Sequence, residues 1–162
     1  MITVTDATVE QAPLVHRIML DAFAEYLGIL DPPSGAHAET VEDVIAAMDQ
    51  GGAVIAWENG DAIGSGRWRM DEGSVYIGRI SVLPAYRGRG AAHAMLMHME
   101  RIARERGFSR TRLGVRVLLP QNIELYQKVG YVITEKITHP KGNAEVVFME
   151  KKLTAENTEK NE

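Results

Sequence analysis

The 162-residue chain contains no cysteine. Disulfide bridges, zinc sites with thiolate ligands and a catalytic cysteine are therefore excluded. Aromatic residues make up only 6% of the chain, and no apolar run approaches the roughly 20 residues that a membrane-spanning helix needs. The N-terminus also lacks a basic segment followed by an apolar one. We therefore expect no targeting peptide, no membrane association and, by default, a cytoplasmic location.

The chain also lacks a large excess of charge of one sign. The 18 basic and 22 acidic residues give a formal net charge of −4, which argues against a protein that holds nucleic acid by its net charge. The five histidines are isolated or wrongly spaced for a helical pair of metal ligands, so no metal site is expected. The composition is that of one globular domain, residues 1–153, followed by a polar stretch, residues 154–162, that predicts a disordered tail.

Hydrophobic periodicity and turn signals predict the element order β-α-α-β-β-β-α-β-α-β-β. Residues 51–52, Gly-Gly, are expected to end the second helix, and residues 28–39, with two prolines, should form an ordered loop. The predicted strands are residues 2–5, 53–57, 62–70, 75–83, 112–118, 131–138 and 144–153, and the predicted helices are residues 8–27, 40–50, 91–106 and 121–128.

A turn of glycine, alanine and arginine, residues 87–92 (Arg-Gly-Arg-Gly-Ala-Ala), connects a predicted strand to the longest amphipathic helix pattern after it. Free N–H groups and the positive end of the helix dipole meet at such a turn, which favours phosphate binding. A dinucleotide-binding fingerprint is excluded because position 93 is His93, and a P-loop is excluded because no Gly-Lys-Ser/Thr follows.

Two ordered motifs specify the phosphate ligand. Arg87, Gly90 and Ala92 fit Arg/Gln-x-x-Gly-x-Gly/Ala, and residues 122–131 fit Asn-x-x-Leu-Tyr-x-x-x-Gly-Phe/Tyr. Together they resemble the GCN5-related N-acetyltransferase (GNAT) family. The resemblance implies a single-domain α/β (α+β) GNAT fold, with a mixed, mostly antiparallel sheet of about seven strands flanked by four helices. It also implies an enzyme that moves an acetyl group from acetyl-CoA to a primary amine.

The resemblance also implies the roles of individual residues. Direct attack in a ternary complex is expected, since the chain has no cysteine to carry the acetyl group. Tyr126 occupies the position of the family's catalytic tyrosine and, as a phenol with a pKa of about 10, could protonate the leaving thiolate; the alternative is that its ring only packs. Val82 is implied as the oxyanion donor through its N–H. The residues implied to contact acetyl-CoA are Ile80, Ser81, Val82, Arg87, Gly88, Arg89, Gly90, Ala91, Ala92, Asn122 and Tyr126.

Alternatives stay open for three of these residues, and the strand before the glycine turn departs from the pattern of some family members. Arg87 and Arg89 could be a solvated basic corner, and Asn122 could be an N-cap residue. The strand at residues 75–83, which must separate from residues 112–118 to admit the pantetheine arm, lacks the glutamate that some family members carry there.

The general base and the acceptor are also left open. Glu25, Asp31, Glu39 or a water relay could remove the amine proton, and these three carboxylates near residues 28–39, the expected roof of the acceptor site, predict a cationic acceptor. A small-molecule amine leads over a peptide or protein amine, and a homodimer is left open. The alternative function is a catalytically silent CoA-binding sensor or interaction module.

Overall fold

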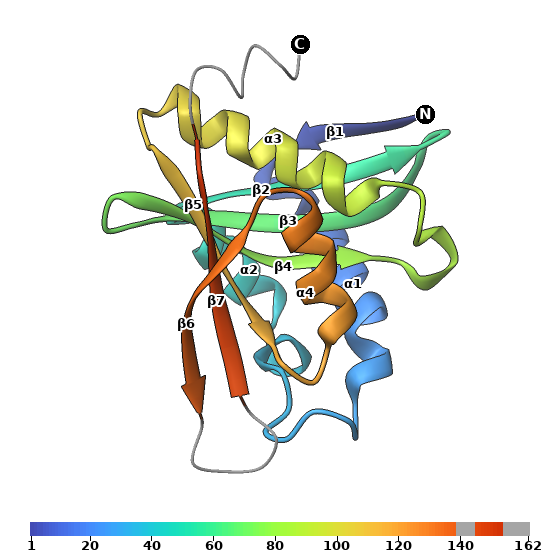
Figure 1. Cartoon of the computed structure of the whole chain (residues 1–162). Helices are drawn as coiled ribbons and strands as arrows, with labels where there is room; N and C mark the ends of the chain where they lie inside the picture. The colour runs from blue at the N-terminus through green and yellow to red at the C-terminus, as the bar shows by residue number, and fades with distance from the viewer. Residues whose placement is uncertain (139–144, 154–162) are drawn as a thin grey trace.

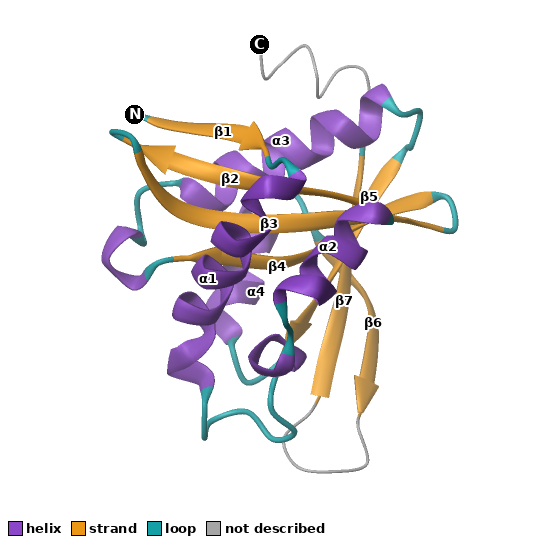
Figure 2. Cartoon of the chain, turned by 180° about the vertical axis from the view of Figure 1, so that it is seen from behind, coloured by secondary structure: helices purple, strands orange, loops and turns teal. Residues whose placement is uncertain are grey.

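The computed structural model describes residues 1–138 and 145–153, which form one twisted seven-stranded sheet with helices on both faces (Figures 1 and 2). The strand order is β1-β2-β3-β4-β5-β7-β6, and every neighbouring pair is antiparallel except β4 and β5. The strands are β1 (Ile2–Asp6), β2 (Gly51–Glu58), β3 (Asp61–Asp71), β4 (Ser74–Val82), β5 (Arg110–Arg116), β6 (Val132–Thr138) and β7 (Glu145–Lys152). The helices are α1 (Ala12–Phe23), α2 (Val41–Asp49), α3 (Ala91–Glu105) and α4 (Pro120–Lys128), with 3₁₀ turns η1 (Val9–Gln11), η2 (Ala24–Tyr26), η3 (Gly35–Ala38) and η4 (Pro84–Tyr86).

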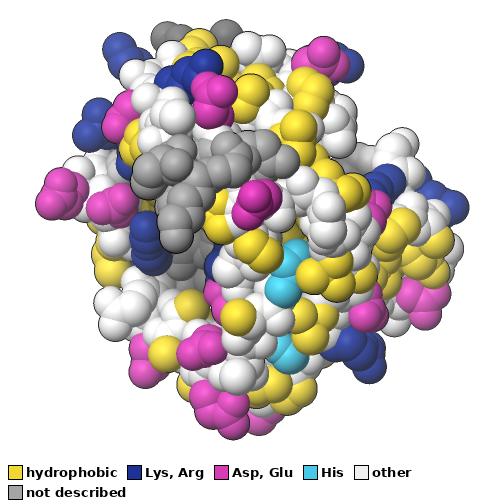
Figure 3. Space-filling model, turned by 90° about the horizontal axis from the view of Figure 1, so that it is seen from below, with side chains coloured by type: hydrophobic (Ala, Val, Ile, Leu, Met, Phe, Trp, Pro, Cys, Tyr) yellow, Lys and Arg dark blue, Asp and Glu magenta, His cyan; other side chains and the backbone are white. Residues whose placement is uncertain are grey.

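The predicted element order and fold class are confirmed, and the differences lie at the ends of elements. The first helix stops at Phe23 and continues as η2, and β5 begins and ends two residues earlier than predicted. The predicted tail, residues 154–162, lies outside the described residues. On the surface seen in Figure 3, acidic and basic side chains are interspersed among apolar ones, in keeping with the small net charge.

The two faces of the sheet carry separate hydrophobic cores because side chains alternate along each strand. On β2, Ala53 and Ile55 pack with the buried residues of α1 and α2, whereas Val54 and Ala56 pack with those of α3. All four side chains are at most 2% exposed, so β2 is covered on both faces. Figures 1 and 2 show α3 and α4 on one side of the sheet and α1 and α2 on the other.

The expectation that Gly51 and Gly52 end a helix is wrong. Helix α2 ends at Asp49 with Gln50 as its C-cap, and both glycines are already part of β2, paired with β3. A Cβ atom at Gly51 would lie 1.9 Å from the carbonyl oxygen of Trp68, and one at Gly52 would lie 2.8 Å from the Trp68 indole nitrogen. These glycines therefore allow the close approach of two strands, a requirement that the sequence pattern alone does not distinguish from a helix stop.

Strands β4 and β5 separate along most of their length, as predicted. Within the described residues their register includes only Val75 with Thr111 and Tyr76 with Arg112. The pairing between β3 and β4 is also irregular. Its register shifts between Ser65 and Arg67 of β3. The sheet therefore divides into β1–β4 and β5–β7, which meet at the start of β4 and open beyond it (Figure 1).

A buried polar cluster connects α3 to the β5–β7 half. The Glu100 carboxylate is 1% exposed and accepts hydrogen bonds from the Tyr131 hydroxyl (3.0 Å) and the Lys151 ammonium (2.9 Å). The Tyr131 hydroxyl also lies 2.8 Å from Thr111 Oγ1. A carboxylate this deeply buried requires such partners. Because the Tyr131 ring packs edge-on against Tyr126, with centroids 6.1 Å apart, the cluster also fixes the position of that side chain.

Candidate active site

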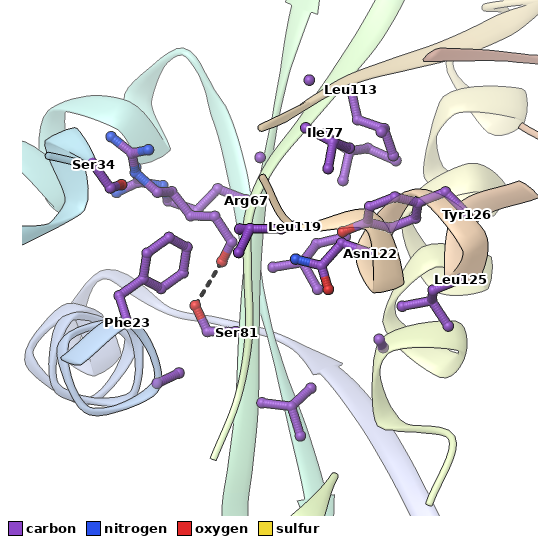
Figure 4. Close-up of a pocket in the computed structure, with 18 of the residues that line it drawn as sticks. Phe23, Ser34, Arg67, Ile77, Ser81, Leu113, Leu119, Asn122, Leu125 and Tyr126 are labelled. Carbon is purple, nitrogen blue, oxygen red and sulfur yellow. Dashed lines mark hydrogen bonds between the residues drawn. The ribbon is translucent and has the colours of Figure 1, made fainter. Parts of the chain in front are cut away.

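A cavity of about 800 Å³ lies where β4 and β5 separate. Figure 4 shows Phe23, Ser34 and Arg67 on one side of the strand that carries Ser81, and Asn122 and Tyr126 on the other. The walls come from α1, the loop after it, the middle strands, the turn before α3, and α4. One continuous space therefore joins the predicted phosphate turn to the loop that was expected to cover the acceptor.

The turn before α3 presents an open backbone. Gly90 is the N-cap of α3 with a φ of +91°, and Gly88 has a φ of +78°. A Cβ atom at either position would meet nothing within 4 Å, so the glycines are required by conformation and not by crowding. The first N–H groups of α3 have no acceptor within the helix, and Gly90 has no side chain to cap them. This turn fits an anionic group such as the pyrophosphate of acetyl-CoA.

The two arginines of this turn hold it in place. Arg87 forms an ion pair with Glu25 at 2.6 Å and donates to the carbonyl oxygens of Val82 (3.1 Å) and Ala22 (3.2 Å). The turn is thereby fastened to the end of α1 and to β4. Arg89 pairs with Glu58 at 3.1 Å and lies outside the cavity lining. Neither side chain is simply a solvated cation, because both are paired with a glutamate, which leaves the backbone N–H groups of the turn as the groups open to a ligand.

The main chain of β4 is exposed to the gap at alternate residues. Leu83 donates its N–H to Ile63 at 2.9 Å, and Val82 stands opposite Gly64. Since hydrogen-bonded and non-hydrogen-bonded pairs alternate in an antiparallel ladder, Val82 directs its N–H and C=O away from β3, towards the gap. Ser81, opposite Ser65, directs its main-chain groups to β3, which differs from the expectation that it meets the pantetheine arm. Ile80 lies in the irregular part of the β3–β4 pairing, where the alternation is interrupted, and it lines the cavity.

Helix α4 places Tyr126 and Asn122 on the cavity wall. Burial raises the pKa of Tyr126 well above its ordinary value, so the phenol stays protonated at neutral pH. Its hydroxyl takes part in none of the hydrogen bonds found among residues 1–138 and 145–153. Asn122 is the third residue of α4, whose N-cap is Leu119, so the N-cap interpretation of Asn122 is wrong.

Tyr26 is a cavity residue that the sequence did not single out. Its position on the apolar stripe of the first helix pattern gave it a packing role, but it lies in η2 and its hydroxyl interacts with the side chain of Asn122. Burial raises the pKa of Tyr26, and the hydrogen bond from Asn122 opposes that change. Tyr26, just after α1, and Asn122, in the first turn of α4, therefore both line the cavity.

The three carboxylates proposed as bases are differently placed. Glu39 accepts both Nη atoms of Arg67 (2.8 and 2.9 Å) and the Nε and Nη2 atoms of Arg79 (3.2 and 3.0 Å). Burial alone would raise the pKa of Glu39, but the hydrogen bonds and charges of the two arginines outweigh burial and lower it. Glu25 is paired with Arg87, and Asp31 is not among the residues that line the cavity. The basis for predicting a cationic acceptor is therefore lost, because two of the three carboxylates are already neutralised.

Replacement of Glu39 by glutamine should destabilise the fold by about 1–3 kcal/mol at pH 7, since two largely buried guanidinium groups lose their anionic acceptor. The pKa of Glu39 is lowered from 4.5 in the folded chain. This stabilisation is therefore complete above about pH 4.5 and is lost as the pH falls through the lowered folded value. Urea unfolding of both proteins between pH 7 and pH 3 should show the difference narrowing with acidity. Glu124→Gln, at an exposed position of α4, is the control, and a difference that stays constant with pH would contradict this account.

Comparison with known proteins identifies the class of enzyme. Residues 17–131 match the acetyltransferase (GNAT) family. The chain therefore belongs to the GNAT family of acetyl-CoA-dependent N-acetyltransferases. Among the described residues, no helix is both long enough and apolar enough to cross a bilayer.

Similar proteins are found in several microorganisms. The chain is 30% identical over 132 residues to the uncharacterized N-acetyltransferase YjgM of Escherichia coli (strain K12). This match covers 76% of this chain and 78% of YjgM. It is 28% identical over 96 residues to the uncharacterized N-acetyltransferase YjcF of Bacillus subtilis (strain 168), covering 59% of this chain and 66% of YjcF.

Solved structures share the fold at low sequence identity. Ard1 from Thermoplasma volcanium superposes with a TM-score of 0.78 at 18% identity, covering 94% of this chain and 98% of Ard1. The PaiA N-acetyltransferase from Thermoplasma acidophilum, solved in complex with coenzyme A, superposes with a TM-score of 0.76 at 17% identity, covering 94% and 99%.

Proposed function

We propose that this enzyme transfers the acetyl group of acetyl-CoA to the primary amine of a small molecule by direct attack in a ternary complex. The observation that carries the proposal is the single cavity that reaches from the turn before α3, past the gap between β4 and β5, to the loop after α1. Both substrates can occupy such a space at once. The absence of cysteine removes an acyl-cysteine intermediate from consideration.

Acetyl-CoA would bind along the α3 and α4 side of the gap. The backbone N–H groups of residues 88–92 would hold its pyrophosphate, since they lie at the N-terminus of a 15-residue helix. The main-chain groups of Ile80 would meet a pantetheine amide, and Asn122 would contact the arm from α4. Arg87 would act indirectly, through its bonds to Glu25 and Val82.

The reaction needs a hydrogen-bond donor to the negative oxygen, a proton donor to the thiolate and an acceptor for the amine proton. The amine nitrogen attacks the thioester carbonyl carbon, a C–N bond forms, and the C–S bond breaks to release the thiolate. The Val82 N–H would stabilise the negative oxygen of the transition state, and the Tyr126 hydroxyl would protonate the thiolate. The ion pairs of Glu25 and Glu39 favour a water relay over a direct carboxylate base for the amine proton.

A screen for thiol release from acetyl-CoA tests the proposal. The panel contains amino acids, aliphatic and aromatic amines, polyamines and short peptides, with product mass measured for every positive amine. We expect thiol release with small amines and a mass increase of one acetyl group. Coenzyme A binding measured by calorimetry, together with no thiol release across the panel, would instead support the silent sensor module.

A further inference from the structure

Four arginines on the neighbouring strands β3, β4 and β5 line the cavity. Arg67 and Arg69 share one face of β3, and the Arg69 guanidinium lies 4.4 Å from the centre of the Tyr76 ring on β4. A Cβ atom at Gly114 on β5 would lie 3.0 Å from the Tyr76 hydroxyl, so Gly114 faces the same way. Arg116, two residues further along β5, therefore points to this face too.

The fourth of these arginines is Arg79 on β4. It approaches the same place from the distorted part of the strand, where its φ is +52°. A Cβ atom at Gly35 would lie 3.0 Å from Arg79 Nη2, so η3 closes directly over this guanidinium. The arginine group, defined as Arg67, Arg79 and Arg116, therefore lines one cavity, and the loop after α1 covers Arg79 directly.

The charge of the arginine group is not balanced. Arg67 and Arg79 share the single carboxylate of Glu39, and each donates two of its five N–H bonds to it. In the described part of the chain Arg116 forms no ion pair, and its Nη1 atom is buried without a hydrogen-bond acceptor. Three cations therefore face one anion, and buried cations without partners are costly.

We propose that the acceptor carries a carboxylate beside its primary amine, so that the substrate is a small amino acid whose carboxylate binds Arg116 and Arg79. This inference rests on the proposed function and names the class of acceptor for it. The guanidinium fork pairs with a carboxylate through two parallel hydrogen bonds. Glu39, bound in this way by Arg67, demonstrates that the arginine group accommodates a carboxylate. The amine of the same molecule is then held near the gap between β4 and β5, where the thioester is expected.

The test compares matched acceptors. The 20 standard α-amino acids, their α-carboxamides and the corresponding decarboxylated amines are assayed for thiol release, with O-phosphoethanolamine added as an amine that carries a different anion. We expect at least one amino acid to be acetylated with a kcat/KM about 10- to 100-fold above that of its amide, which is the effect of losing a hydrogen-bonded charged group. Equal or better use of the amides, of the plain amines or of O-phosphoethanolamine would overturn the inference while leaving the proposed function intact.

Variants of Arg116 test whether this residue is responsible for the preference for a carboxylate. Arg116→Gln should raise the KM for the preferred amino acid about 10- to 100-fold and lower kcat/KM for the amide far less, and Arg116→Lys should restore part of the loss. Arg110→Gln, at the opposite end of β5 and paired with Glu150 at 3.3 Å, is the matched control. An Arg116→Gln variant that binds coenzyme A normally and keeps the wild-type KM for the amino acid would overturn the inference.

Measurements of amino acid binding distinguish the proposed acetyl transfer from the proposed carboxylate site. Calorimetry with the enzyme–coenzyme A complex measures amino acid affinity without any turnover. Amino acid binding that Arg116→Gln weakens, without thiol release for any amine, would reject the acetyl transfer but keep the carboxylate site. Thiol release with amines, without preference for the carboxylate, would do the reverse.

Discussion

Replacement of Gly90 by glutamate should abolish acetyl-CoA binding while the protein stays folded. The new side chain would extend into the open space above the turn, where a Cβ atom meets nothing within 4 Å, and its carboxylate would repel the phosphates that the α3 N-terminus attracts. Like charges brought together in a binding site cost several kcal/mol, so calorimetry should show a loss of affinity of at least about 100-fold.

Gly73→Glu is the matched control for that variant. Gly73 lies in the turn between β3 and β4, has a φ of +84° and also has open space around the Cβ position, but it does not line the cavity. The control therefore carries the same backbone strain and the same added charge away from the site, and it should bind acetyl-CoA normally. Unchanged affinity in a folded Gly90→Glu variant would contradict the phosphate assignment.

Tyr126→Phe should lower kcat by about 100- to 10,000-fold, which is the range for a positioned general acid. The phenylalanine ring keeps the edge-on contact with Tyr131, so the affinity for coenzyme A should change little. A loss confined to kcat marks an interaction made mainly in the transition state. Steady-state kinetics combined with calorimetry makes the measurement.

Tyr131→Phe serves as the comparison for Tyr126→Phe. It removes the hydroxyl that donates to Glu100 but leaves the aromatic contact with Tyr126, so it should reduce stability more than turnover. If Tyr126→Phe keeps wild-type turnover while chemistry is rate-limiting, Tyr126 has only a packing role. The thiolate would then be protonated by water or by the acceptor amine.

The sequence predicted the parts of this molecule that depend on local order along the chain. The glycine turn at residues 87–92, the helix after it and the segment at residues 122–131 are each contiguous, and their separation along the chain already indicated the family. The separation of β4 from β5 followed from the same resemblance and is confirmed by the register. The element order could be predicted because hydrophobic periodicity and turn residues are local signals.

The features that could not be predicted depend on contacts between distant residues. Glu39 looked like a free carboxylate in a loop, because nothing in the sequence places it between Arg67 and Arg79, which are 28 and 40 positions away. Gly51 and Gly52 looked like a helix stop, because their close contact with Trp68 arises only in the folded sheet and leaves no local signal in the sequence. Withdrawing the expectation of a cationic acceptor therefore required knowledge of how Glu25 and Glu39 pair.

The opening between β4 and β5 also bears on how ligand binding should change the resistance of the protein to proteolysis. The two halves of the sheet share few main-chain bonds at this opening, so local separation there costs less than unfolding of either half. A bound molecule that touches both β4 and α4 bridges the halves, and at a hundredfold excess over its Kd it stabilises the closed form by about 2.7 kcal/mol. We therefore expect the purified enzyme to resist proteolysis better when acetyl-CoA is added than when it is absent.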